Sequence, residues 1–219
     1  MNKLLVVSLL IICNTCAKQT KDEVVNDNVD FLSRERDTTY TQILLNVHQK
    51  GEVMEELQLY ASNKKDTILN QYKLFRNGVL DTAQSRYYIL SIGRTKRPNV
   101  YQGTITVNSY INKLILSKGE EFDFEFSYWQ VTKDSTYLTT HKAKQKNKIR
   151  FKYTNIVDDN LSGIILINSR NDTVENGEEM VRLRSLQMLV DNKEKTNNVF
   201  LNAFNFYKDN RFEYKKMYP

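Results

Sequence analysis

Cysteine is nearly absent from this sequence, and its distribution excludes one class of protein. Of the 219 residues only Cys13 and Cys16 are cysteines, and both lie within the first sixteen positions. A small secreted domain held together by disulfides needs several cysteines spread along the chain. That class is therefore excluded, and the fold must depend on a hydrophobic core.

Histidine and glycine are also scarce, which removes several kinds of site. The two histidines, His48 and His141, have no ligand motif around them, so a zinc site built from His and Cys is not predicted. The seven glycines form no phosphate-binding loop, and no nucleophile-elbow pattern surrounds a serine. We therefore expect no metal and no cofactor.

Carboxylates are the remaining candidates for catalysis, and four adjacent pairs occur. These are Glu55-Glu56, Glu120-Glu121, Asp158-Asp159 and Glu178-Glu179. Adjacent side chains on a strand point to opposite faces, so the members of such a pair cannot act together. A glycan hydrolase with two carboxylates is accordingly a minor alternative, and we assign no catalytic residue.

Long hydrophobic runs are missing as well. The longest, residues 4–12, is mostly aliphatic, follows Lys3 and ends before the polar sequence that begins at Lys18. Nine helical residues extend for about 14 Å, roughly half the hydrocarbon thickness of a bilayer. A stable membrane span is not expected here. A positive tip, a short apolar centre and a polar break are instead typical of a bacterial export signal.

The end of this run, Cys13-Asn14-Thr15-Cys16, resembles a bacterial lipoprotein signal. In such signals a cysteine that follows small residues receives lipid and becomes the first residue of the mature protein. Cys16 fits better than Cys13, because Thr15 precedes it whereas the bulky Ile12 precedes Cys13. The resemblance implies a signal peptide over residues 1–15, a lipid on Cys16 that binds the membrane, and a place in the cell envelope, facing the periplasm or on the outer membrane. Simple secretion is the alternative.

The mature chain is expected to begin with a flexible polar tether, residues 16–39, rich in Asp, Glu, Asn, Lys, Arg and Thr. Residues 40–219 then form one domain. The hydrophobic fraction of 40% and the 1 Trp, 13 Tyr and 10 Phe indicate a folded core. The net charge of +6, or +5 without Lys3, is basic but moderate.

Helical spacing is found in residues 40–61. Its apolar residues recur at intervals of three and four, with Gly51 as a break: Ile43, Leu44, Val47, Met54, Leu57 and Ala61. This pattern predicts a short amphipathic helix, or two, that packs on the core.

From Asp66 onward the period changes to two, which predicts a mainly β domain. Asn77-Gly78 is typical of a tight hairpin turn, with residues 86–92 as the returning strand. Phe122, Phe124, Phe126 and Tyr128 alternate with polar residues, as in a strand with one buried face. With only two prolines to interrupt strands, we predict an antiparallel sandwich or barrel. The expected strands are 68–75, 86–92, 104–109, 113–117, 122–128, 149–153, 162–168, 180–190, 199–207 and 212–217.

A basic stripe occupies every second position between His141 and Tyr153. Its members are Lys142, Lys144, Lys146, Lys148, Arg150 and Lys152. On one extended strand all six would share a face at spacings of about 6.6 Å, which suits an anionic lipid surface or an acidic glycan. Two other interpretations stay open, a solvated edge strand protected by its lysines and a loop over the early part.

Five copies of Asp followed by a hydroxyl residue form a second unusual feature. The hydroxyl residues are Thr38, Thr67, Thr82, Ser135 and Thr173. Locally, such aspartates cap turns. The pattern is also similar to the O-glycosylation sequence of exported Bacteroidota proteins. With the signal segment and the Tyr- and Asn-rich strands, the chain resembles a small Bacteroidota cell-envelope lipoprotein, a resemblance that carries no functional residue.

Trp129 falls on the polar side of the alternating strand, where it would stack on a sugar or a protein unless a bulge returns it to the core or a second sheet covers that face. We expect a non-enzymatic envelope protein that binds a protein or glycan partner or has a structural role. A module that binds polyanions through the basic stripe is the alternative, and nucleic acid is not an expected partner of an exported protein.

Overall fold

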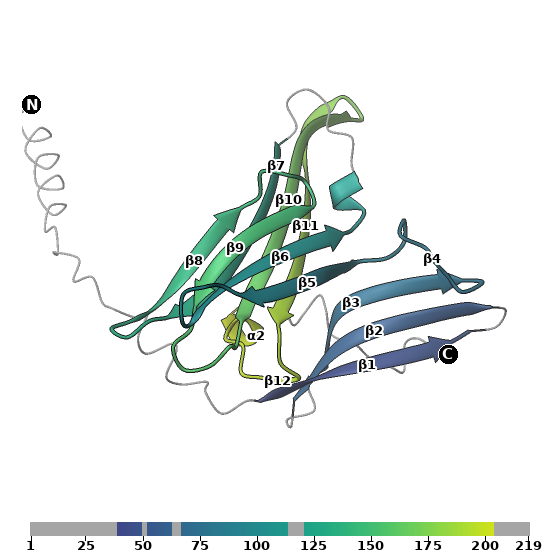
Figure 1. Ribbon diagram of the computed structural model, residues 1–219. Coiled ribbons are helices and arrows are strands. Elements are labelled where there is room, and N and C mark those ends of the chain that lie inside the picture. The colour runs from purple at the N-terminus through teal and green to yellow at the C-terminus, as the bar shows by residue number, and fades with distance from the viewer. Residues whose placement is uncertain (1–38, 50–51, 63–66, 114–120, 204–219) are drawn as a thin grey trace, which may run out of the picture. The chain divides into compact units, whose positions relative to one another are not determined.

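The computed structural model describes residues 39–49, 52–62, 67–113 and 121–203, all within one compact unit. Most of these residues lie in strands, which form three antiparallel sheets (Figure 1). The predicted mainly β fold is therefore confirmed. Among the described residues, no helix is long and apolar enough to cross a membrane.

The first sheet corrects the predicted helix at residues 40–61. This segment forms two strands, β1 (Tyr40–His48) and β2 (Val53–Ser62), which pair so that Leu45 lies opposite Leu57 and Ile43 opposite Leu59. An interval of four residues is even, so Ile43 and Val47 share one face of a strand as well as one face of a helix. The order of the sheet is β12 (Lys195–Thr196), β1 (Tyr40–His48), β2 (Val53–Ser62), β3 (Thr67–Arg76) and β4 (Val79–Leu80).

The predicted turn at Asn77-Gly78 is confirmed, but the strand that follows it and pairs back onto β3 is not the expected one. Both residues have positive φ angles, 52° and 73°, as a two-residue hairpin turn of this kind requires. The returning strand is the two-residue β4. The predicted strand at 86–92 becomes β5 (Tyr87–Arg94), which joins another sheet, and Arg86, just before it, forms an isolated bridge to Tyr72 of β3.

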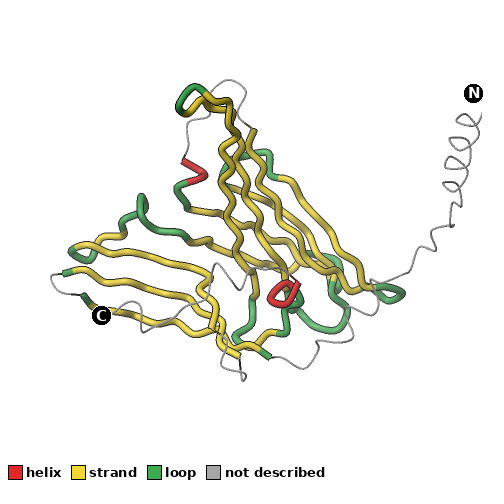
Figure 2. The backbone as a smooth tube through the Cα atoms, turned by 180° about the vertical axis from the view of Figure 1, so that it is seen from behind, coloured by secondary structure: helices red, strands yellow, loops and turns green. Residues whose placement is uncertain are grey.

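Two further sheets enclose the main core (Figure 2). One has the order β11 (Glu178–Asp191), β10 (Ser162–Glu175), β7 (Glu121–Val131) and β8 (Thr136–Lys142). The other has the order β5, β6 (Val100–Asn108) and β9 (Lys148–Thr154). Phe124, Phe126 and Tyr128 of β7 pack with Ile105 and Phe151 in this core, which confirms the alternation predicted for residues 122–128.

Gly103 of β6 shows how closely this core is packed. It pairs with Phe151 of β9, whose ring occupies the space that a side chain on residue 103 would need. Any larger residue here would displace the ring from its neighbours in the core.

The opposite face of the β10–β11 strands is covered by the first sheet and by a short helix, α2 (Phe200–Ala203). The buried cluster there contains Tyr40, Tyr60, Ile68, Ile164, Leu189, Phe200 and Leu201. The predicted strand at 199–207 is thus wrong for the four residues of α2, and its remainder beyond residue 203 lies outside the described residues. Of the strand predicted at 113–117, Lys113 ends the 3-10 helix η1 (Ile111–Lys113), and residues 114–117, like 212–217, lie outside the described part.

A buried polar junction joins the first sheet to the end of β11. The carboxylate of Asp191 accepts hydrogen bonds from Tyr60 (2.8 Å), Ser162 (2.8 Å), Thr196 (2.7 Å) and Asn198 (3.0 Å). All four donors are neutral, so they solvate the carboxylate without cancelling its charge. Burial therefore raises the pKa of Asp191 to about 6 despite these bonds.

Asn70 of β3 completes the junction by acting like a short piece of backbone. Its side-chain amide donates to the Leu189 carbonyl (2.9 Å) and accepts from the Leu189 N–H (2.7 Å). The same amide nitrogen also donates to Gln58 (2.9 Å). The buried side chain of Asn70 thereby forms the hydrogen bonds that its burial requires, and it links two sheets.

Candidate functional site

The structure divides the predicted basic stripe into two parts. Lys142 is the last residue of β8, Lys144 and Lys146 lie between strands, and the other three cations lie on β9. The chain turns in between, where Gln145 forms a bridge to Lys148. A single straight row of six cations is therefore wrong, and the loop interpretation holds for residues 143–147.

Two cations of the first part are engaged within the chain. Lys142 forms an ion pair with Glu125 across β7 and β8 at 2.8 Å, and this partner raises the pKa of the lysine. The Lys146 ammonium lies 5.8 Å from the centre of the Phe122 ring. These contacts make the first part a poor site for an external anion.

The second part belongs to an ordered polar surface, which we call the cationic face. Its three rows cross β5, β6 and β9 in register. They are Ile89–Thr106–Lys148, Ser91–Thr104–Arg150 and Gly93–Gln102–Lys152. In each row a cation on β9 lies beside a hydroxyl or amide side chain on β6, and successive cations are about 6.6 Å apart. Within the described residues, none of the three cations forms an ion pair.

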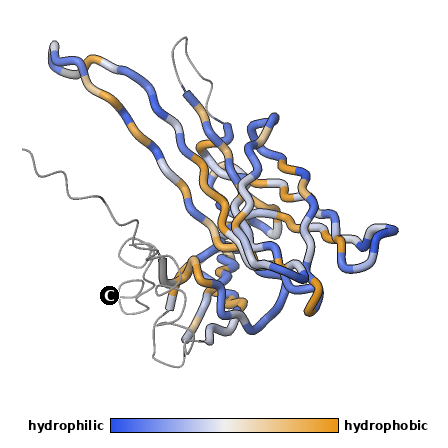
Figure 3. Tube along the Cα trace, turned by 90° about the vertical axis from the view of Figure 1, so that its left-hand side faces the viewer, coloured by the Kyte–Doolittle hydropathy of each residue, from blue (hydrophilic) through white to orange (hydrophobic). Residues whose placement is uncertain are grey.

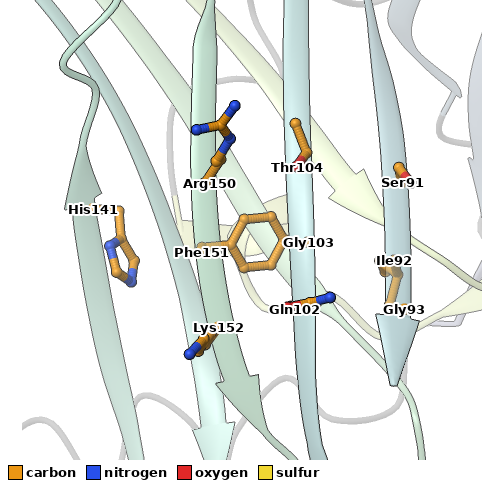
Figure 4. A pocket seen from close by; sticks show the side chains of 10 residues that line it. All are labelled: Ser91, Ile92, Gly93, Gln102, Gly103, Thr104, His141, Arg150, Phe151 and Lys152. Atoms are coloured by element: carbon orange, nitrogen blue, oxygen red, sulfur yellow. The ribbon is translucent and has the colours of Figure 1, made fainter. Parts of the chain in front are cut away.

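A pocket of about 640 Å³ lies at two of these rows (Figure 4). It is lined by Ser91, Ile92, Gly93, Gln102, Gly103, Thr104, His141, Arg150, Phe151 and Lys152. The small residues contribute to the hollow, since the space that a side chain on Gly93 would fill is open. The pocket therefore combines two exposed cations with neutral hydrogen-bonding groups.

His141 of β8 is held at the edge of this pocket. Its Nε2 lies 2.9 Å from the hydroxyl of Tyr128, and the two rings stack with centroids 5.7 Å apart. The Tyr128 hydroxyl donates its proton to the Lys152 carbonyl at 2.5 Å, so it must accept from His141, which places the imidazole proton on Nε2. Burial also raises the pKa of Tyr128, which keeps the phenol protonated. The Nδ1 atom remains for a ligand or for water.

The sequence did not indicate His141 or the polar residues of β5 and β6 as site residues. Ser91, Gln102 and Thr104 are distant from the basic stripe in sequence, and only cross-strand pairing brings them beside its cations. The polar residues that alternate along 102–106 indicate that one face of this strand is solvated, but this pattern does not show which strands lie beside it.

The other predicted site residues lie apart from this face. Trp129 is half-buried against the cluster that contains Ile164 and Leu189, so it is not an exposed stacking residue. Thr82 and Ser135 are exposed in turns, whereas Thr67 and Thr173 are half-buried in strands. Cys16 and Thr38 lie outside the described residues.

One of the Asp-hydroxyl pairs shows the expected turn chemistry. The Asp81 carboxylate accepts from the backbone N–H groups of Ala83 (3.0 Å) and Gln84 (3.2 Å). For metals, the described ranges hold no group of three or more His, Cys, Asp or Glu side chains arranged to bind an ion.

Comparisons with protein-family models, with curated proteins and with solved structures found no match for this chain. The candidate site therefore rests on the geometry of the cationic face and its pocket.

Proposed function

We propose that this is an exported, lipid-anchored cell-envelope protein that binds a ligand without converting it, and that its cationic face holds an acidic glycan. The first part of the proposal is supported by the signal-like residues 1–16. The second is supported by one observation above all. Three cations without ion-pair partners in the described chain stand in line, each beside a neutral hydrogen-bonding side chain.

An extended acidic polysaccharide suits this arrangement better than a lipid surface. Its carboxylates recur along the chain and its hydroxyls lie between them, so it needs both charges and neutral donors and acceptors. Lys148, Arg150 and Lys152 supply the charges, with Arg150 able to bind a carboxylate through two parallel bonds. Thr104 and Gln102 supply the neutral groups. Anionic lipid headgroups would use the charges alone.

Charge reversal tests this proposal. The variant Lys148→Glu, Arg150→Glu, Lys152→Glu is expected to bind polygalacturonate at least tenfold more weakly than the parent. The parent's affinity should fall as salt is raised, because exposed charges are screened within about 10 Å at 0.1 M salt. Biolayer interferometry on the full chain in detergent measures both effects, with neutral dextran as the control ligand.

A matched control variant reverses three exposed cations on other elements, Lys133, Arg170 and Lys195. It should bind polygalacturonate within about twofold of the parent, although its net charge changes by the same amount. Equal losses in the two variants would mean that only overall charge matters. If the parent does not bind polygalacturonate but binds anionic vesicles, the ligand of the cationic face is an anionic lipid surface and not an acidic glycan.

Anchoring is tested separately. Cys16→Ala is expected to leave the membrane fraction or to remain unprocessed, because the multiple lipid chains on a modified cysteine hold a protein firmly. The intact mass of the N-terminal peptide is the measurement. An unmodified Cys16 in the parent, or retention of Met1, would refute lipidation.

A further inference from the structure

The end of the β10–β11 hairpin is a surface that the proposed function does not use. Beyond the pair Arg170–Glu121, β10 has no described neighbour other than β11, and the two strands continue to a turn at Asn176 and Gly177. Both turn residues have positive φ angles, 55° and 84°, as a tight two-residue turn requires. We call residues 171–185 the hairpin arm (Figures 1 and 3).

The arm exposes apolar side chains, which do not stabilise a hairpin that has no neighbour to bury them. Val174, Val181 and Leu183 are 66%, 50% and 72% exposed and lie on one face of the two strands. Charged residues alternate with them, as the mixed colouring of the arm in Figure 3 shows. Isolated two-stranded hairpins are only marginally stable in water. An additional strand beside β11 would stabilise the arm.

β11 is the edge strand of its sheet in the described chain, and apart from Leu189, which bonds Asn70, its outer N–H and C=O groups do not pair with another described strand. A strand of the same sequence fits there in one particular register. In an antiparallel pair related by a two-fold axis perpendicular to the sheet, residues that face each other must lie on the same face of the sheet. With Val181 opposite its own copy, Glu178 lies opposite Arg184, and this pair occurs twice.

Neighbouring registers are less favourable. Centring the pair on Arg182 places two guanidinium groups opposite each other, and centring it on Leu183 places Arg182 opposite Arg184. Like charges directly opposite on a sheet are destabilising. Centring it on Met180 keeps Glu178 opposite a cation but moves residue 184 past the turn, so fewer strand residues pair.

We propose that the protein forms a two-fold dimer in which β11 strands of two copies pair antiparallel about Val181. The occupant of the edge is thus a second copy of this chain, chosen by the repeated Glu178–Arg184 complementarity. The inference is independent of the cationic face and of the ligand proposed for it. Its consequence is one continuous sheet across two protomers, with two cationic faces in one particle.

Charge exchange provides the test. Glu178→Arg and Arg184→Glu, each alone, place like charges opposite each other twice and are expected to raise the dimer dissociation constant at least tenfold. The double variant restores opposite charges and should return it to within about threefold of the parent value. Sedimentation equilibrium of the full chain in density-matched detergent measures all four proteins.

The register is tested by cysteine substitution. Val181→Cys should form an intermolecular disulfide under mild oxidation, whereas Val174→Cys, comparably exposed but on β10, should not. The parent, which contains Cys13 and Cys16, is run on the same non-reducing gel to show how much cross-linking occurs without an introduced cysteine. A monomeric parent at 100 µM, single variants that remain dimeric, a double variant that is not restored, or equal cross-linking at 174 and 181 would each overturn the proposal.

Discussion

Replacing Phe126 by alanine is expected to lower the free energy of unfolding by about 3–5 kcal/mol, the usual range for a buried aromatic residue. Phe126 is 0% exposed, and its ring centroid lies 5.0 Å from that of Tyr128 and 4.8 Å from that of Phe151. The ring also packs against Gly163, where an added Cβ would lie 2.7 Å from it. Gly163 has no side chain to fill the resulting cavity, so little relaxation is expected.

Phe122→Ala is the matched control for this prediction. Phe122 lies on the same strand and the same face but is only partly buried at the margin of the core. Its truncation should cost less than half as much as that of Phe126. Urea unfolding followed by tyrosine fluorescence or circular dichroism measures both variants. Equal losses for the two would show that β7 does not direct Phe126 into the main core.

The second large effect is a pH dependence caused by Asp191. Its pKa is about 6 in the folded protein and 3.8 when unperturbed, because burial disfavours the charged carboxylate. The folded state therefore binds this proton more tightly than the unfolded state does. The stability that the protonated group contributes is complete below about pH 4 and is lost as the pH rises through 6. The shift corresponds to a loss on the order of 3 kcal/mol.

Asp191→Asn is expected to remove this dependence between pH 4 and 6. The other titratable groups facing the site are Tyr60 and Tyr88, whose pKa values are raised by burial and which stay protonated throughout that window. Asparagine keeps the size of the side chain but turns an NH₂ group towards two of the four donors. The variant should consequently be less stable than the parent at pH 4, where the parent carboxyl is protonated.

Asp159→Asn supplies a control of opposite sign. Asp159 is exposed and ion-paired with Lys193, which lowers its pKa, so its contribution is lost as the pH falls. Unfolding by urea at half-unit steps from pH 3.5 to 7 distinguishes the two variants. If Asp191→Asn keeps the parent's slope between pH 4 and 6, another group is responsible for it.

Local patterns in the sequence determined several features of the fold. The strict alternation from Phe122 to Tyr128 predicts a strand with one buried face, because the side-chain period of a strand is two. Asn77 and Gly78 predict a tight turn, because both tolerate positive φ angles. These signals depend on neighbouring residues alone, and the structure confirms them.

Other patterns permit more than one structure, and only tertiary contacts chose between them. The spacing of Ile43 and Val47 fits a helix and also fits one face of a strand, since an interval of four residues is even. Pairing along the whole of β1 and β2 decides for the strand. Trp129 lies on the polar side of β7, as its position predicts, yet it is half-buried there against a hydrophobic cluster that contains Ile164 and Leu189.

The candidate site depends on the tertiary structure for the same reason. The sequence placed cations at every second position from Lys142 to Lys152 but could not show that the chain turns between Ala143 and Lys148, because no glycine or proline marks this turn. The rows that join Arg150 to Thr104 and Ser91 exist only through cross-strand register. So does the junction at Asp191, whose four donors come from three separate segments of the chain. Composition and local period determine which residues prefer strands, but the register between distant strands determines which side chains meet.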